Sequence, residues 1–587
     1  MDPVTLEVVY NSTAQVAHEL TIKMMRTGYS TIIKESGDVT FAICDREGRL
    51  VAQHMVDPIH LGVIPAQVGE ILRTFAGRIQ PDDAFILNSP YRACQNHMSD
   101  TTLVSPVFYQ GEIVAFVANT AHKPDTGGKV PGTNAGDATD LFQEGLVIPP
   151  VKLYRGGELN DDVYEFIVAN TRTPITTWGD TQAQALTNIH GAHRLVELLE
   201  RFGAATVLAA WAEWADICAR EMRARIASLP EGRVGPITDY LDDDGIYLDR
   251  PLAITALLEK RGDELIFTFD SAPQARGPVN VRPCITRAAT EYVCKAVLAP
   301  GLPNNHGVGK PITTVFPPEG HLLNPRYPAP VNMYATTVHR VSPLVMWLMA
   351  QLAPDRAMAP SAGANVAISL NGVDQRHGRR FSQYEILHGG YGARPTRDGI
   401  GGMAQDGSNV LNTPVEAIES EFPVRVERYA LRPDSGGAGR WRGGLGIRRE
   451  WRVLADEVTM NLRGDRVKFA SPGVYGGSAG QPGSATLNPD TPAPRPLHVK
   501  ATNVRLAAGD LVQLDMAGAA GWGPPGERDP AHVARDVRAG YVSRPAAREV
   551  YGVEVDGETW SAAPVPERRG PTAAERSGGP PARPAGT

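Results

Sequence analysis

Three residues in the first quarter of the chain, His97, Asp100 and His122, have the types and spacing of ligands for one divalent metal ion. They lie in two stretches, AFILNSPYRACQNHMSD and GEIVAFVANTAHKPDTGG, in which an apolar run is followed by polar and turn-forming residues. Each run predicts a buried strand that ends in a loop. If the two strands are neighbours in one sheet, their loops leave the sheet at related places and the three side chains converge.

Two imidazoles and one carboxylate suit Zn, Mn or Fe and leave positions open for water or substrate. An open position is the property that separates a catalytic metal from a structural one. The spacing by itself is a weak pattern in a chain with 14 histidines. The alternative is a pair of loop histidines hydrogen-bonded to neighbouring backbone, and the residues alone leave both interpretations open.

Further polar residues lie near these stretches. His60 and Glu144, the latter in the segment FQEGL, are candidates to orient water or to hold the second ring nitrogen of a ligand histidine. The alternative for both is a hydrogen-bonded structural role. Asp125 is predicted to be a turn residue, and Cys94 a small packing residue beside the metal stretch.

Size and composition limit the class of protein. A chain of 587 residues predicts three or four domains, and its 42% hydrophobic and 21% charged residues are typical of a globular protein. The net charge of −7 argues against nucleic-acid binding. No signal-peptide pattern or membrane-length apolar run is visible, so we expect a cytoplasmic protein. The five cysteines are scattered without a CxxC pair, which argues against a disulfide framework.

Periodicity predicts the order of elements along the chain. We expect a helix over 4–30, a hairpin over 38–52, a helix after Pro65, and helices over 181–227, 285–298, 337–353 and 381–390. Segment 126–161 is rich in Gly and Pro and is predicted to be a long ordered loop or a lid rather than a core element. Short strands are expected from residue 234 and again up to about residue 516.

This mixture of elements predicts an α+β fold with several domains. The predicted regions are 1–230 with the metal site and a helical segment, 231–400 as a central α+β region, 401–556 as a mainly β region with a terminal helix, and 557–587 as a disordered tail. Neither a P-loop nor a G-x-G-x-x-G fingerprint between strand and helix is present, so the sequence predicts no nucleotide site in this chain.

Long ordered motifs give the chain a family resemblance. They include GRLVAQ, HLGVIPA, NSPYRACQNHMSDTTLVSPVF, AHKPDTGG, GTNAGDATDLFQEGLVIPPVKLYRGGELN and RVERYALRPDSGGAGRWRGGLGIRREW. The chain resembles the hydantoinase B family from its start to about residue 556. That family includes the B subunits of N-methylhydantoinases and the related half of 5-oxoprolinases. Caprolactamase and the acetone and acetophenone carboxylases are its relatives.

The resemblance implies a hydantoinase B-like fold with mixed sheets and helical segments. It implies a divalent metal in this subunit and an A-type partner subunit that uses ATP with Mg, in a heterotetramer of two A and two B subunits. The family's metal ligands carry over onto His97, Asp100 and His122. Asp38, in KESGDVTF, matches a position near the metal in lactam-opening relatives and is expected to be a ligand or a general base.

The implied function is ATP-dependent hydrolysis of a cyclic amide, opening a hydantoin, oxoproline or lactam ring after the partner phosphorylates the carbonyl oxygen. The alternative is a subunit of an ATP-dependent ketone carboxylase, whose counterpart is generally longer than 587 residues. A third possibility is a non-catalytic scaffold subunit. No nucleic-acid or membrane partner is implied.

One departure concerns the metal stretch. Many relatives have NDPYxGGTH, whereas this chain has NSPYRACQNH, in which Ala93 and Cys94 replace the two glycines. The loop therefore either needs no positive φ or follows a different backbone path. The shape of the pocket depends on which is correct.

Overall fold

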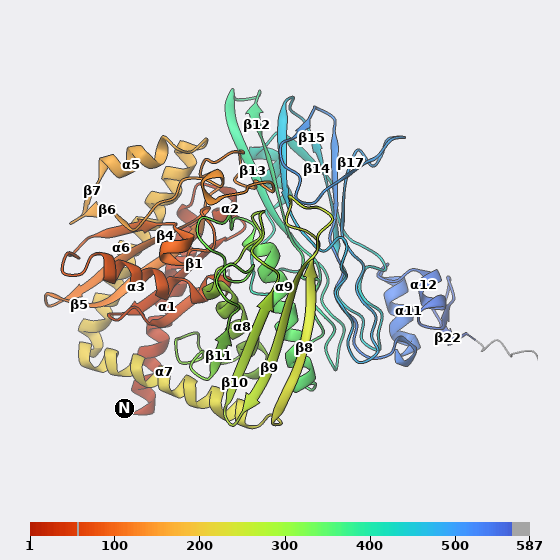
Figure 1. The fold of residues 1–587 in the computed structure, drawn as a ribbon, viewed down its shortest axis with the longest axis horizontal. Helices are drawn as coiled ribbons and strands as arrows, with labels where there is room; N and C mark the ends of the chain where they lie inside the picture. Colours follow the sequence, from red (N-terminus) through yellow and green to blue (C-terminus); the bar gives the residue numbers. More distant parts are fainter. Residues whose placement is uncertain (56–57, 566–587) are drawn as a thin grey trace, which may run out of the picture.

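The computed structural model describes residues 1–55 and 58–565 and has an α+β architecture with several packed layers (Figure 1). The predicted fold class is confirmed. Residues 562–564, which we assigned to the disordered tail, form strand β22 (Ala562–Pro564) instead, and residues 566–587 lie outside the described residues. No helix of the described chain has the length and apolar content needed to cross a membrane.

The N-terminal layer is built on a seven-stranded sheet. Its strands, in their order across the sheet, are β2 (Leu50–Met55), β1 (Val39–Asp45), β5 (Glu112–His122), β4 (Asp100–Tyr109), β3 (Ala84–Leu87), β6 (Val151–Arg155) and β7 (Glu158–Leu159). Its helices are α1 (Pro3–Thr27), α2 (Thr31–Lys34), α3 (Ile64–Thr74), α4 (Pro90–Ala93), α5 (Asp161–Val168), α6 (Pro174–Phe202) and α7 (Ala204–Ala227).

Both faces of this sheet are buried. Successive side chains along β1 and β5 point to opposite faces, and both sets are largely apolar. Phe41 and Val117 belong to a core with α1 and α6, whereas Ala42 and Phe116 pack on the other face with α3. Strands covered on both faces read as nearly continuous apolar runs, which is how the sequence predicted them.

Local signals set the ends of these elements. Asp2 begins α1, since its carboxylate accepts the backbone N–H groups of Val4 and Thr5. The predicted β1–β2 hairpin is confirmed. It turns at Gly48, whose φ of +82° suits glycine, and Asp45 accepts two N–H groups of the turn.

The central layer is a four-stranded sheet that packs against two helices. Its elements are β8 (Gly232–Leu241), β9 (Leu252–Arg261), β10 (Glu264–Ser271), β11 (Ile312–Val315), α8 (Pro283–Leu298) and α9 (Tyr334–Leu352). Helix α9 is buried along nearly its whole length and runs through the middle of the molecule (Figure 1). The predicted helices over 285–298 and 337–353 are confirmed.

The C-terminal layer contains two sheets that share one apolar core. One consists of β13 (Arg379–His388), β12 (Asn365–Asp374), β16 (Val458–Arg463) and β19 (Val504–Leu506), and the other of β14 (Val424–Leu431), β15 (Ile447–Val453), β20 (Leu511–Asp515), β17 (Ser484–Leu487) and β18 (Arg495–Leu497). Helix α10 (Val415–Glu421) precedes β14. Helices α11 (Pro530–Arg538) and α12 (Arg544–Glu549), with β21 (Val553–Val555) and β22, project at the far end (Figure 1).

Two local predictions are wrong. The helix expected over 381–390 is strand β13, because pairing with β12 over ten residues decides a short apolar run that is ambiguous in the sequence. Segment 126–161 is largely an ordered loop, as predicted, but its exclusion from the core is wrong, since Val130, Ala135 and Ala138 are buried together and β6 joins the large sheet. The first of the sheets in the C-terminal layer also draws strands from both sides of residue 400, where we place a region boundary.

A buried ion-pair network joins the central and C-terminal layers. Asp465 follows β16 and binds two cations. Its Oδ2 is 2.6 Å from Arg340 Nη2 on α9, and its Oδ1 is 3.0 Å from Lys500 Nζ. All three side chains are at most 2% exposed. Burial opposes ionisation of Asp465, but Arg340 and Lys500 outweigh it and hold its pKa below the ordinary value.

We expect Asp465→Asn to destabilise the protein by about 3–5 kcal/mol, because it leaves two buried cations without their shared carboxylate. Asp216→Asn is the control, since the Asp216–Lys310 pair is exposed and worth less than about 1 kcal/mol. Thermal unfolding of the two variants beside the wild type measures the difference. Equal melting temperatures of the two variants would contradict a contribution of this network to stability.

Candidate metal centre

The three predicted ligands meet at one edge of the N-terminal sheet. The side chains were expected to converge if the two strands were neighbours. Strands β3 and β5 are not neighbours, but β4 lies between them and pairs antiparallel with both. Because β3 and β5 are therefore parallel, they end at the same edge of the sheet. Asp100 begins β4 directly opposite His122, the last residue of β5, and His97 lies in the loop that leads into β4.

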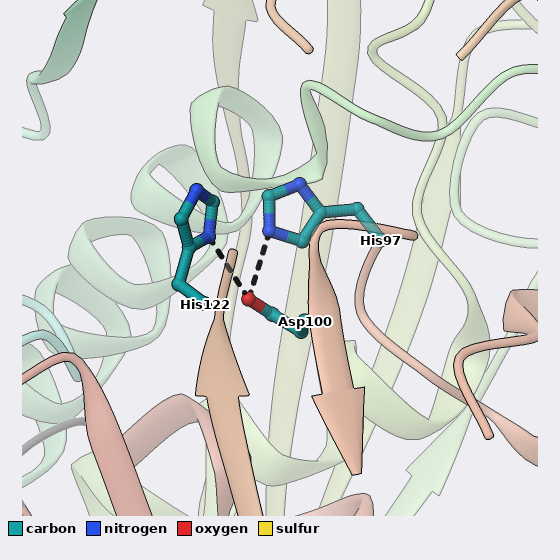
Figure 2. A group of neighbouring side chains, drawn as sticks. All are labelled: His97, Asp100 and His122. Atoms are coloured by element: carbon teal, nitrogen blue, oxygen red, sulfur yellow. Dashed lines mark hydrogen bonds and ion pairs between the residues drawn. The ribbon is translucent and has the colours of Figure 1, made fainter. Parts of the chain in front are cut away.

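Both imidazoles point at one oxygen of Asp100 (Figure 2). His97 Nε2 is 3.0 Å and His122 Nδ1 is 3.1 Å from Asp100 Oδ1. The three side chains are buried, and their ligand atoms lie within 4.8 Å of one another. His60, on the short 3-10 helix η1 (Pro58–Gly62), approaches the other oxygen, with Nε2 3.4 Å from Asp100 Oδ2.

Each ionisable side chain of this group affects the pKa of its neighbours. Burial opposes ionisation of Asp100, but the neighbouring His97 and the hydrogen bonds with His122 and His60 outweigh it and hold the Asp100 pKa well below its ordinary value. Burial lowers the pKa of His122, which favours the neutral imidazole. An ionised carboxylate and a neutral imidazole are the protonation states that bind a metal.

Hydrogen bonds of His97 show which of its nitrogens is free. His97 Nδ1 lies 2.8 Å from Asn332 Oδ1 and 3.1 Å from the Asn332 carbonyl oxygen. Both partners are acceptors, because the Asn332 amide nitrogen donates to the Thr133 carbonyl. Nδ1 therefore carries the proton, and in the neutral ring the lone pair of Nε2 faces an oxygen of Asp100.

This arrangement fits a divalent cation. A lone pair that faces a carboxylate oxygen at 3.0 Å needs a positive charge beside them, supplied by a proton or by a metal ion. His122 Nε2 is buried and has no hydrogen-bond partner in the described chain. His97, which donates its Nδ1–H to Asn332, has the arrangement that is typical of a ligand histidine in metal sites.

Asp38 and His60, the other two predicted residues of the site, line the same small cavity as the three ligands. The backbone carbonyl of Asp38 accepts the N–H of His122, which places Asp38 at the start of β1 beside β5. Burial raises the pKa of the Asp38 carboxyl, and His122 partly offsets this effect. His60 Nδ1 lies 3.2 Å from Thr40 Oγ1 on β1.

Glu144 is not among the residues that line the cavity, but it binds the backbone of Asn332, which orients His97. Its two carboxylate oxygens accept the backbone N–H groups of Val331 and Asn332, at 3.1 and 2.7 Å. Burial raises its pKa to about 8, and these two donors oppose the shift. Glu144 therefore holds the residue that orients His97, rather than a ring nitrogen itself. The turn prediction for Asp125 is confirmed, because it accepts the Gly127 N–H.

The loop with the altered motif has a left-handed residue that is not glycine. Cys94 has φ +56° and ψ 32°, which excludes the first of the two alternatives, that this loop needs no positive φ. Cys94 is also bonded to Cys284 on α8 in a disulfide. This pairing corrects both the packing role given to Cys94 and the argument against disulfides. Cysteines 190 positions apart in the sequence give no local signal of pairing.

Sequence reasoning missed one wall of the cavity. The additional lining residues are Tyr334, Ala335, His339, Asn365, Ile386, Ser408 and Arg463. They come from α9, β12, β13, β16 and the loop after β13, more than 200 residues from the ligands along the chain. Asn332 was missed for the same reason, and no local motif identifies any of these residues.

Comparisons with known proteins define the class of this chain. A model of the hydantoinase B/oxoprolinase family matches residues 2–525, and the chain belongs to that family. It is 32% identical over 574 residues to the caprolactamase subunit beta of Pseudomonas jessenii, covering 95% of this chain and 97% of that protein. The crystal structure of the ATP-dependent caprolactamase from that organism matches with a TM-score of 0.88 at 30% identity, over 95% and 97% of the two chains.

Two further matches extend the comparison. The chain is 29% identical over 549 residues to 5-oxoprolinase 1 of Arabidopsis thaliana, covering 89% of this chain but 42% of that protein. A nucleotide-free structure of acetone carboxylase matches with a TM-score of 0.88 at 20% identity, over 98% of this chain and 82% of that chain. At that identity the likeness shows a shared fold.

We expect the purified chain to bind about one divalent metal ion per molecule, and His97→Ala and His122→Ala each to abolish this binding, because a site with three protein ligands loses a ligand in each variant. Metal analysis after reconstitution with Zn, Mn or Fe measures it. His193→Ala, an exposed histidine on α6, is the control and should bind as the wild type does. Metal retained by both ligand variants would contradict the site.

We expect Asn332→Ala to weaken metal binding by about 10–100-fold while every ligand remains, because His97 loses the acceptor that fixes its ring. Competition with a metal chelator measures the affinity. Asn324→Ala is the matched control, since Asn324 lies on the same loop and its side-chain nitrogen donates to the Pro317 carbonyl, away from His97. If both variants bind metal equally tightly, Asn332 does not support the site.

Proposed function

We propose that this chain is the metal-dependent subunit of an ATP-dependent cyclic amide hydrolase that opens a hydantoin, oxoproline or lactam ring. The observation that carries the proposal is the buried group of His97, Asp100 and His122. Its support from outside the chain is the similarity to caprolactamase subunit beta along nearly the whole length of both proteins. A chain that acted only as a scaffold would have no use for such a ligand set in its interior.

The proposal includes a partner that handles ATP. The sequence contains neither a P-loop nor a dinucleotide fingerprint. Its relative is named as a subunit, and the chain corresponds to less than half of a 5-oxoprolinase. We therefore propose an A-type partner that binds ATP with Mg and phosphorylates the carbonyl oxygen, in a heterotetramer of two A and two B subunits.

The chemistry follows from the substrate. A cyclic amide resists hydrolysis because resonance stabilises it, and phosphorylation of its carbonyl oxygen removes that resonance and makes the carbonyl carbon more electrophilic. After water adds to this carbon, the C–N bond breaks and the ring nitrogen leaves as a protonated amine; a second water then hydrolyses the acyl phosphate to a carboxylate and phosphate. A divalent ion held by His97, Asp100 and His122 would lower the pKa of water and polarise the carbonyl. Asp38 is proposed as a fourth ligand or as the group that accepts a proton. His60 holds the second Asp100 oxygen, and Glu144 positions His97 through Asn332.

The runner-up is a subunit of a ketone carboxylase. The observation in its favour is the shared fold with acetone carboxylase. The match covers 82% of that longer chain and has 20% identity, against 97% coverage and 32% identity for caprolactamase subunit beta. The hydrolase is therefore the better supported of the two.

The test is to reconstitute the chain with its ATP-using partner and to follow ATP hydrolysis together with ring opening of hydantoin, 5-oxoproline and caprolactam. We expect ring opening that needs both subunits and ATP. His97→Ala should lower it by more than about 100-fold, since even residues that only support metal ligands cost about 10–100-fold. His193→Ala should have no effect.

Parallel reactions with acetone and bicarbonate decide between the two candidates. Carboxylation without ring opening would replace the hydrolase by the carboxylase. Full ring opening by a His97→Ala complex that holds no metal would contradict the metal-dependent mechanism.

A further inference from the structure

The wall of the cavity opposite the metal ligands carries a buried cation. Arg463 ends β16, lines the cavity together with His97, Asp100 and His122, and is 2% exposed. Its Nη2 donates to Asn365 Oδ1 at 3.0 Å, whereas its Nε has no hydrogen-bond partner in the described chain. A buried N–H without an acceptor is unfavourable unless a ligand or water supplies one.

Arg463 differs from the other buried arginines of the C-terminal layer. Arg449 is paired with Glu385 at 2.9 Å, and Arg466 with Asp239 at 3.0 Å. Among the described residues, none of the ion pairs involves Arg463. A guanidinium that is buried without a carboxylate is costly, and an anion bound in the cavity would offset that cost.

The neighbouring histidines do not supply that partner. His339 Nδ1 donates to the Ala335 carbonyl at 2.7 Å, and its Nε2 has no hydrogen-bond partner among the residues that the structure describes. Burial, with a smaller contribution from Arg463, lowers the His339 pKa to about 4. Burial likewise lowers the pKa of His388, behind this wall, to about 3. Both rings are therefore neutral near pH 7 and leave the charge of Arg463 in place.

The two carboxylates that line the cavity are not partners of Arg463. Among the described residues, neither Asp38 nor Asp100 forms an ion pair or a hydrogen bond with its guanidinium, and the oxygens of Asp100 face the three histidines instead. Within the described chain, the guanidinium therefore has no anionic partner. The cavity measures about 20 Å³, enough for a group of about the size of one water molecule.

We propose that Arg463 is the anion-binding residue of this site and holds a negatively charged oxygen of the substrate against the metal ligands. The guanidinium fork matches the geometry of carboxylate and phosphate oxygens, which makes either one a suitable ligand. The two sources are the phosphoryl group of an ATP-activated amide and a carboxylate of the substrate. The inference rests on the proposed function for the identity of the substrate, but not for the binding of an oxyanion.

Isothermal titration of the full chain with formate and with inorganic phosphate tests the proposal. We expect the wild type to bind at least one of them, and Arg463→Met to bind it at least about tenfold more weakly, because a charge-assisted hydrogen bond is lost. Arg463→Lys keeps the charge and should lose less. Arg505→Met is the control, because Arg505 lies exposed on β19 beside β16 and should leave binding unchanged.

The two anions distinguish the sources. Tighter binding of phosphate supports the phosphoryl group, and tighter binding of formate supports a carboxylate. Equal anion affinity of wild type and Arg463→Met would overturn the proposal, as would a wild type that binds neither anion. A fall in melting temperature with unchanged anion affinity would show a structural role only. If Arg463→Met does not fold, Arg463→Gln, which also removes the charge, replaces it, and wild-type affinity of that variant for both anions overturns the proposal.

Metal content, measured on the same samples, separates this inference from the proposed function. A chain that binds no metal but binds phosphate through Arg463 would contradict the function and support the inference. A chain that binds metal equally in wild type and Arg463→Met, with the same anion affinity in both, would contradict the inference alone.

Discussion

A carboxylate buried among three histidines is the constraint on which the site depends. Asp100 is 2% exposed, and an isolated ionised carboxylate at that depth would be strongly unfavourable. His60 and His122, each with a ring nitrogen within 3.4 Å of its oxygens, and a positive charge between His97 and Asp100, supplied by a proton or by a metal ion, compensate for the lost water. Each histidine comes from a different element, so the carboxylate is compensated only when η1, the loop before β4 and the end of β5 are all in place. The fold of the N-terminal layer and the formation of the site are therefore linked.

The second layer of support comes from far along the chain. Asn332 fixes the ring of His97, and Glu144 fixes the backbone of Asn332, which ties segment 126–161 to the loop before α9. This explains why a Gly- and Pro-rich segment is buried rather than exposed. The network around Asp465 then holds α9 to the C-terminal layer. Through these contacts all three layers contribute to the geometry of one small cavity.

The family comparison and the cavity answer different questions. Caprolactamase and acetone carboxylase share this fold with TM-scores of 0.88, so the fold does not choose between ring opening and carboxylation. In the proposed site, the three ligands determine that a metal ion can bind. The opposite wall, with Arg463 and the neutral His339, determines which substrate groups can bind beside that ion. In the altered NSPYRACQNH loop, Cys94 has a left-handed backbone, and a disulfide ties the loop to α8. The loop therefore has a positive φ without a glycine and a covalent link to the central layer.

The sequence by itself determined what depends on neighbours along the chain. Helix α1 with its Asp2 cap, the β1–β2 hairpin with Gly48, and the spacing of His97 and Asp100 are local patterns, and the family motifs identified the candidate ligands. Tertiary structure alone decided the rest. Whether residues 381–388 are helix or strand depends on β12, and the partner of Cys94 is 190 positions away. The contacts of Asn332 and Arg463 with the cavity likewise depend on packing between layers, because they join segments whose separation in sequence carries no signal of proximity in space.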